Sequence, residues 1–168
     1  WMNRPTTQLT APGSTFKMVT AFAALEEGVV TAHEKINDLG IFEKIPLPAK
    51  CHIYPRTHGA VDISNAIKMS CNYYFYESAY RLSIDSNGEF NDKLGLDKIK
   101  KYASLFGLDT TSGVEVGEAM PNVSDVDPVR SSIGQGSHVY TPIGLSRYVT
   151  TLANRGTILF RFLYHSIY

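Results

Sequence analysis

The tetrad Ser14-Thr15-Phe16-Lys17 places a hydroxyl and an amine at a spacing that can support chemistry. Side chains three residues apart on a helix share one face, so the Lys17 amine is expected beside the Ser14 hydroxyl. A free serine hydroxyl is a weak nucleophile, and a neutral amine beside it can accept its proton. The tetrad therefore predicts a nucleophilic serine with a lysine base. A serine at a helix start is also a common N-cap, so these four residues alone leave a structural role open.

The triplet Ser70-Cys71-Asn72 is a second candidate group, and it begins 56 residues after Ser14 (70 − 14). The order S-x-x-K, then a serine-containing triplet ending in Asn, then K-T-G is a catalytic set of penicillin-binding proteins and class A β-lactamases. Here Cys71 occupies the middle position of the triplet, where that set has Asp. Taken alone, Ser70 and Asn72 would be ordinary turn or cap residues.

Three segments in this order resemble penicillin-binding proteins: residues 8–24 around the tetrad, residues 58–76 around the triplet, and residues 133–157. The third segment, with Ile133-Gly134-Gln135-Gly136, is similar to the class B, monofunctional members and favours them over a β-lactamase. The chain is therefore identified as a member of the class B penicillin-binding proteins, within the transpeptidase domain.

The resemblance implies a serine D,D-transpeptidase that cross-links peptidoglycan through an acyl-enzyme on D-Ala-D-Ala stem peptides. It implies that Ser14 is the nucleophile, Lys17 the base and Ser70 a proton relay, with Asn72 holding Lys17 and the substrate amide. It requires no cofactor. Two alternatives stay open: a β-lactam sensor domain, which is acylated without turnover, and a catalytically inactive scaffold of the cell-wall machinery.

The expected partners are stem peptides, β-lactam antibiotics and a glycosyltransferase of the cell-wall complex. The resemblance places the catalytic domain on the extracytoplasmic side of the cell membrane, held by an anchor outside this chain. The 16 basic and 16 acidic residues balance, so charge gives no argument for binding nucleic acid.

The sequence contains no Lys-Thr-Gly or Lys-Ser-Gly triplet. We therefore expect residues 1–168 to form a partial transpeptidase domain that lacks the strand of the third motif. Such a chain would keep the Ser14 backbone N–H as one oxyanion donor and lose the other, so weak or no activity is expected of it alone. The aromatic residues 159–168 would either replace a missing strand or promote aggregation.

A metal site is a separate hypothesis, which rests on Asp38, Cys51 and His58 as oxygen, sulfur and nitrogen ligands. The C-x₆-H spacing matches no standard zinc finger, and a structural zinc takes four ligands. Some class B transpeptidases carry a zinc near the S-x-N segment, and this chain resembles them in having candidate ligands there. We name these three residues as tentative zinc ligands with His52 and Cys71 in reserve. A disulfide between the two cysteines, or free thiols, remain alternatives.

The elements that must position these groups are predicted to be mainly helical. Apolar spacing, caps and breakers predict helices over residues 14–27, 62–69, 72–82, 96–106 and 142–154. The proline-rich residues 36–57 predict loop and brief strands. The predicted fold is mainly α with short β, as part of the α/β serine transpeptidase (penicillin-binding protein and β-lactamase-like) fold without most of its central sheet. The nucleophile helix would then expose apolar surface.

Overall fold

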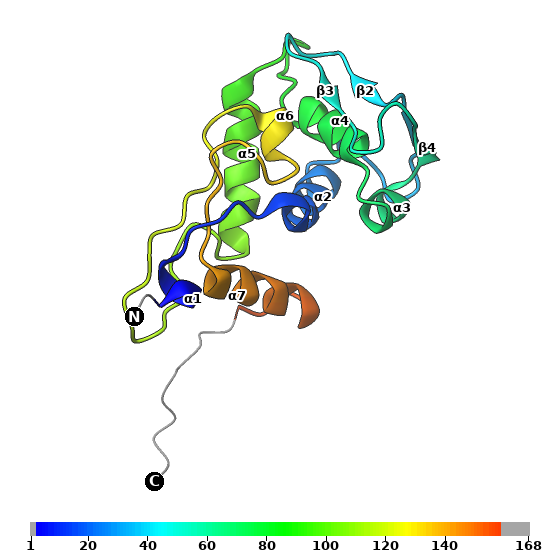
Figure 1. The fold of residues 1–168 in the computed structure, drawn as a ribbon. Helices are drawn as coiled ribbons and strands as arrows, with labels where there is room; N and C mark the ends of the chain where they lie inside the picture. Colours follow the sequence, from blue (N-terminus) through cyan, green and yellow to red (C-terminus); the bar gives the residue numbers. More distant parts are fainter. Residues whose placement is uncertain (1–2, 159–168) are drawn as a thin grey trace.

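The computed structural model describes residues 3–158 (Figure 1). Its elements, in chain order, are α1 (Arg4–Thr7), the 3₁₀ turn η1 (Gly13–Phe16), α2 (Lys17–Glu26), β1 (Ile36–Asp38), β2 (Ile41–Phe42), β3 (Ala49–Lys50), β4 (Gly59–Val61), α3 (Ile63–Lys68), α4 (Asn72–Leu82), α5 (Asp92–Leu105), α6 (Pro128–Ser131) and α7 (Pro142–Ala153). The prediction of a mainly helical chain with short strands is confirmed.

Helix α2 is the centre of the fold, because it packs against both α4 and α5 (Figure 1). Two apolar clusters fill the interior. One surrounds α4 and the strands and includes Phe42 and Phe75. The other joins the tetrad turn and α2 to α5 and α7, and it includes Phe16, Ile99 and Tyr148. The tetrad therefore lies on an element that is held from several sides.

The strands form two small antiparallel pairs. Strand β1 pairs with β4, with Ile36 opposite Val61, and β2 pairs with β3, with Ile41 opposite Lys50. The predicted mixture of loop and brief strands is confirmed. Within residues 3–158 each sheet has two strands, which agrees with the expectation that this part of the fold lacks a central sheet.

Capping residues account for the helices that were predicted well. Asp62 caps α3, and its carboxylate accepts a hydrogen bond from the Asn65 N–H. Thr141 caps α7, and Pro142 occupies the first helical position as predicted. Helix α4 also has the predicted bounds.

Two helix boundaries were predicted wrongly. The helix expected from residue 14 is a 3₁₀ turn first and becomes α-helical only at Lys17. Helix α5 begins at Asp92 instead of residue 96, with Asn91 as its cap. Gly95 lies inside this helix, and a Cβ there would lie 2.0 Å from the Ser83 Oγ. Glycine in this helix therefore allows close packing instead of ending the helix.

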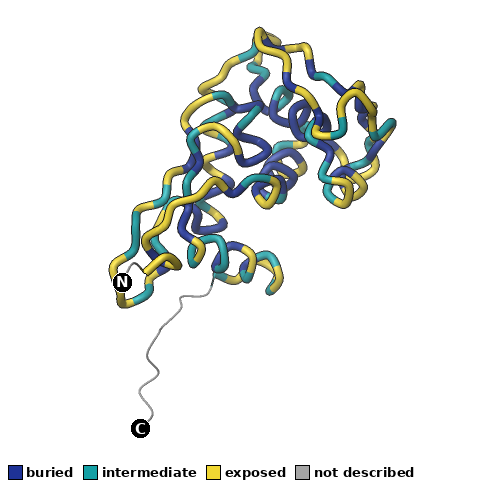
Figure 2. Tube along the Cα trace, viewed as in Figure 1, coloured by how far each residue is buried: buried dark blue, intermediate teal, exposed yellow. Residues whose placement is uncertain are grey.

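Helix α2 exposes large apolar side chains, as expected, and Figure 2 shows how buried and exposed residues alternate along the trace. Phe22 is 46% and Leu25 is 39% exposed. No helix among residues 3–158 has the length and apolar character needed to cross a membrane. The prediction for residues 159–168 falls outside the described residues.

Candidate active site

A tight turn presents the tetrad at the start of α2. Gly13 has a φ of +56°, a conformation that glycine adopts readily, and it begins η1. Ser14 is exposed within this turn, whereas Lys17 is only 2% exposed as the first residue of α2. The nucleophile candidate is thus open to a substrate while its neighbouring amine is buried.

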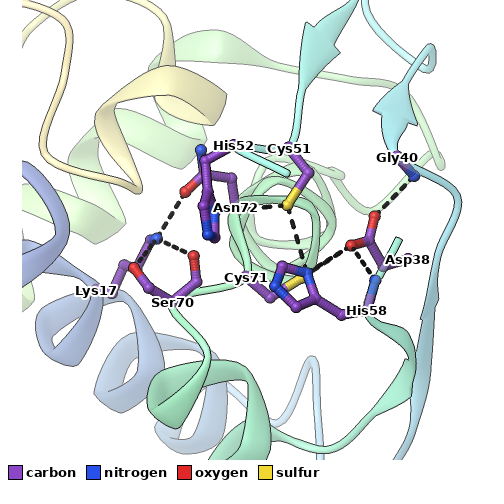
Figure 3. Close-up of polar contacts among 9 residues, drawn as sticks. All are labelled: Lys17, Asp38, Gly40, Cys51, His52, His58, Ser70, Cys71 and Asn72. Atoms are coloured by element: carbon purple, nitrogen blue, oxygen red, sulfur yellow. Dashed lines mark hydrogen bonds and ion pairs between the residues drawn. The ribbon is translucent and has the colours of Figure 1, made fainter. Parts of the chain in front are cut away.

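The Lys17 amine lies at the centre of the predicted catalytic residues, and the structure brings all four together (Figure 3 shows three of them). Its Nζ atom is 3.1 Å from the Ser14 Oγ, 2.8 Å from the Ser70 Oγ and 2.6 Å from the Asn72 Oδ1. It also donates to the Ser70 backbone carbonyl at 2.7 Å. One amine therefore joins the tetrad to the triplet.

Ser70 closes this group from the other side. Its hydroxyl donates to the Ser14 Oγ at 2.9 Å, so Ser14, Lys17 and Ser70 form a closed triangle of polar contacts. Ser70 has a φ of +54°, in the left-handed region that few residues other than glycine adopt. A strained backbone conformation of this kind is kept only where neighbouring contacts fix it, and such residues are frequent at functional sites.

Burial lowers the pKa of Lys17 to about 8, from an ordinary value of 10.5. The nearby thiols of Cys51 and Cys71 oppose this effect, because negative charge there favours the ammonium. A lysine with a pKa near 8 is partly neutral at physiological pH, which a proton acceptor requires.

The glycine-rich segment supports the tetrad turn by backbone contact. The Gly13 N–H donates to the Gly134 carbonyl at 3.3 Å, and a Cβ on Gly134 would lie 2.1 Å from the Gly13 oxygen. The Thr20 hydroxyl donates to the Ser132 carbonyl at 2.7 Å. The sequence flagged this segment by resemblance only, and its physical role is to fit against the turn that carries Ser14.

Two buried side chains that sequence reasoning missed also hold this turn. The Tyr148 hydroxyl, on α7, donates to the Thr15 carbonyl at 2.8 Å. The His138 ring lies 4.1 Å from the Phe16 ring, measured between centroids. Burial lowers the pKa of His138 to about 4. No periodicity or motif in the sequence pairs these distant positions.

The predicted metal ligands converge next to Lys17, Ser70 and Asn72 (Figure 3). Ligand atoms of Asp38, Cys51, His58 and Cys71 all lie within 4.8 Å of one another. The His58 Nδ1 is 2.7 Å from the Asp38 Oδ2 and 3.6 Å from the Cys51 Sγ. The Cys71 Sγ is 3.5 Å from the Asp38 Oδ2. We call these four residues the ligand cluster.

The donor set of the ligand cluster fits a structural zinc ion. Zinc is typically bound by four S, N and O donors at about 2.0–2.3 Å, so the donors lie about 3–4 Å apart. The cluster supplies two sulfurs, one nitrogen and one oxygen, all buried or partly buried. Cys71, named only in reserve, belongs to the cluster, whereas the Nδ1 of the exposed His52 is 3.9 Å from the Cys51 Sγ.

Electrostatics in the cluster favour ligand forms that bind metal. Burial alone would raise the pKa of Asp38, but hydrogen bonds from the His58 and Gly40 N–H groups outweigh it and lower that pKa. A hydrogen bond from the Cys71 thiol lowers the pKa of Cys51, and the same bond, with burial, raises the pKa of Cys71. A carboxylate and one thiolate are therefore favoured, and these are the forms that bind zinc.

An exposed serine beside a buried lysine, a second serine and an amide defines a candidate site for serine acyl transfer. Residues 1–168 match the family model described as the penicillin binding protein transpeptidase domain, so the chain belongs to that family. The resemblance stated from the motifs is confirmed.

Known relatives agree with this family. The chain is 30% identical to peptidoglycan D,D-transpeptidase PbpA of Mycolicibacterium smegmatis, covering 99% of this chain and 33% of that protein. It is 29% identical to peptidoglycan D,D-transpeptidase MrdA of Acinetobacter baumannii, covering 92% and 24%. The crystal structure of Pseudomonas aeruginosa PBP2 in complex with WCK 5153 matches with a TM-score of 0.81 and 27% identity, covering 96% of this chain and 38% of that one.

The fold prediction is confirmed by this solved structure, which is of a penicillin-binding protein. The chain spans about a quarter to a third of the length of the curated relatives named above. Both carry the name of an enzyme, and neither is named as a sensor or a scaffold, so the alternatives to an enzyme family are not favoured.

Proposed function

We propose that this chain is the part of a peptidoglycan D,D-transpeptidase that carries the nucleophile. The observation that carries the proposal is the contact of the buried Lys17 amine with the Ser14 hydroxyl at 3.1 Å. Burial, which lowers the pKa of Lys17, supports its action as a base at neutral pH. The substrate class, a stem peptide ending in D-Ala-D-Ala, follows from the family.

In the first step the Ser14 Oγ attacks the carbonyl carbon of the D-Ala-D-Ala amide. Its proton passes to the Lys17 Nζ as the new C–O bond forms, and the carbonyl electrons move onto oxygen. The Ser14 backbone N–H would supply one hydrogen bond to this oxyanion, at the end of the helix dipole of α2. The Asn72 amide, whose Oδ1 accepts from Lys17, would hold the amine in place.

In the second step the C–N bond breaks and the leaving amine takes a proton. Ser70 is suited to relay that proton, because its hydroxyl contacts both the Ser14 Oγ at 2.9 Å and the Lys17 Nζ at 2.8 Å. The products are free D-alanine and an acyl ester on Ser14. The amine of a second stem peptide then attacks the ester, and the same residues work in reverse.

The domain, partner and location hypotheses form part of this proposal. Residues 1–168 would be a partial transpeptidase domain on the extracytoplasmic side of the membrane, with stem peptides and β-lactams as ligands. A solved structure whose title describes a peptidoglycan synthase complex that coordinates polymerization and crosslinking matches with a TM-score of 0.83 and 26% identity. That title supports a glycosyltransferase as the partner.

We also propose a structural zinc in the ligand cluster. Asp38, Cys51, His58 and Cys71 would hold it, which adds Cys71, named in reserve, to the three residues inferred from sequence. A four-ligand zinc is closed to substrate and supplies only a cross-link between loop and helix. That cross-link would join the loop after β3 to the start of α4, where Ser70 and Asn72 lie. The reaction itself requires no cofactor.

The full-length protein should release D-alanine from a D-Ala-D-Ala peptide and transfer the acyl group to an added amine. Turnover on the peptide distinguishes the transpeptidase from its rivals. A sensor would bind penicillin covalently without peptide turnover, and a scaffold would do neither. Covalent labelling by penicillin without any D-alanine release would therefore replace the proposed function with the sensor.

A further inference from the structure

Two of the four donors in the ligand cluster are thiols, and the proposed reaction uses neither. We propose that Cys51 and Cys71 form a disulfide when the cluster is without zinc, so that the cluster alternates between a metal form and an oxidised form. This inference rests on the proposed zinc site and not on transpeptidase activity. Both cysteines are buried, and their Sγ atoms lie within 4.8 Å of each other.

The geometry places the two sulfurs within 4.8 Å of each other, and the Cys71 thiol donates a hydrogen bond to Cys51. A disulfide has an S–S distance of about 2.05 Å and joins side chains that face each other. The other side-chain contacts of the sulfurs are long: Cys51 Sγ to the His58 Nδ1 at 3.6 Å, and Cys71 Sγ to the Asp38 Oδ2 at 3.5 Å. Backbone N–H groups at the start of α4 also donate to the sulfurs. Closing the remaining gap therefore requires side-chain rotation with backbone movement at the start of α4.

The surroundings of Cys51 provide the route for an oxidant. Most of residues 52–57, which follow it, are exposed; Ile53 is partly buried, and Tyr54 is 44% exposed. Zinc would tie this loop to α4, and its loss would release the loop and admit a small-molecule disulfide. One thiolate attacks that disulfide, and the second thiol then displaces the mixed disulfide. The two cysteines lose two electrons and two protons, and the oxidant becomes two thiols.

The location of Cys71 links this chemistry to the catalytic group. Cys71 stands between Ser70 and Asn72 and precedes the first residue of α4. Ser70 has a φ of +54°, which its surroundings must maintain. A shift of Cys71 toward Cys51 would move both neighbours relative to the Lys17 amine. The oxidised form is therefore expected to acylate Ser14 more slowly than the zinc form.

The test compares zinc-loaded and chelator-stripped full-length protein, each incubated with oxidised glutathione. After denaturation and alkylation, peptide mapping counts free thiols at Cys51 and Cys71. The stripped protein should show the two cysteines joined and neither alkylated, and the zinc-loaded protein should show both alkylated. A reductant followed by zinc should restore the second pattern. The Cys51→Ser variant, stripped in the same way, should form no such internal link.

Three results would overturn the inference: two alkylated cysteines in the stripped protein, glutathione retained on one cysteine, or equal oxidation with and without zinc. Penicillin labelling, followed in parallel, tests the link to Ser70. An unchanged labelling rate in the oxidised protein would refute that link. If no form of the protein labels, the transpeptidase proposal fails, while the thiol count still decides the redox proposal.

Discussion

The Lys17 Nζ atom lies 2.6 Å from the Asn72 Oδ1, although 55 positions separate the two residues in the chain. The first residue of α2 therefore meets the first residue of α4. Because α2 and α4 pack along their apolar faces, the position of this contact depends on the core beneath it. The arrangement of Lys17 and Asn72 is therefore set by helix packing.

Replacing the nucleophile should remove covalent labelling. Ser14→Ala is expected to abolish the label left by a fluorescent penicillin on the full-length protein, because no other hydroxyl lies in the tetrad turn with the same contact to Lys17. Ser14 is exposed, so the free energy of unfolding should change by less than about 0.5 kcal/mol. Labelling is read by gel fluorescence, and stability by thermal unfolding.

Ser86→Ala is the matched control, since Ser86 is also an exposed serine in a turn. It should label at the rate of the unaltered protein. A label that survives in Ser14→Ala would assign the nucleophile to another residue.

The rate of acylation should rise with pH through about 8. The neutral Lys17 amine is the active form, and burial lowers its pKa to about 8. The same shift affects folding. Between about pH 8 and the ordinary value of 10.5 the unfolded chain binds more protons, so the contribution of Lys17 to stability improves as pH rises through that window. Below pH 8 both states carry the proton, and the cost of burying the ammonium is present in full.

Rates measured from pH 6 to pH 10 test the catalytic part of this prediction. A flat profile would contradict a lysine base. In Lys17→Met, the rise in stability between pH 8 and 10.5 that Lys17 contributes should disappear from thermal unfolding curves. If the stability of the variant rises with pH as in the unaltered protein, other groups cause that rise.

Arginine at position 17 should abolish acylation while keeping a positive charge. A guanidinium stays protonated in proteins, so Lys17→Arg cannot accept the Ser14 proton. The expected loss is at least about a hundredfold, the lower range for general base catalysis. Single-turnover labelling measures it. Near-normal labelling in this variant would place the base elsewhere.

The glycine contact behind the tetrad can be tested by one methyl group. In Gly134→Ala the new Cβ would lie 2.1 Å from the Gly13 oxygen, at a φ of +75°. Strain and displacement together should cost about 1–3 kcal/mol of stability and slow labelling, because Gly13 precedes Ser14. Gly117→Ala is the matched control, since a Cβ there meets nothing within 4 Å. Equal behaviour of the two variants would remove the role given to Gly134.

Zinc should copurify with the full-length protein made without a histidine tag, at about one equivalent. Chelation, or His58→Ala, should lower the melting temperature by about 5 °C or more and slow labelling, although no catalytic side chain is changed. His33→Ala, at an exposed histidine, should do neither. Less than about a tenth of an equivalent of metal by elemental analysis would rule out a resident zinc.

The sequence predicted correctly those helices whose ends are set by residues within the helix or next to it, such as caps and prolines. Caps and a first-turn proline identify α3 and α7, and apolar spacing identifies α4. Helices α1 and α6 were missed, because four residues are too few to show a period. The start of α5 was missed by four residues, in a first turn that Asn91 caps and in which Gly95 packs against Ser83.

Part of the candidate site was likewise predictable from local sequence, and part of it depends on contacts made only in the folded chain. Residue types and motif order were enough to name Ser14, Lys17, Ser70 and Asn72, and the fold brings them together. The full ligand cluster was not predicted, because Cys71 joins Cys51 only through the packing of α4 beside the strands. The support of the tetrad turn by Tyr148 depends on contacts across 133 positions, which no local pattern encodes.

The left-handed backbone at Ser70 restricts what this position can become during evolution. Glycine, asparagine and aspartate adopt that conformation most readily, but none carries a hydroxyl. Threonine keeps the hydroxyl, yet its β-branch makes it an outlier at a positive φ. Almost no exchange at Ser70 therefore keeps both the hydroxyl and this backbone conformation. Variation among related sequences should instead fall around this residue, where side chains can change without disturbing the turn.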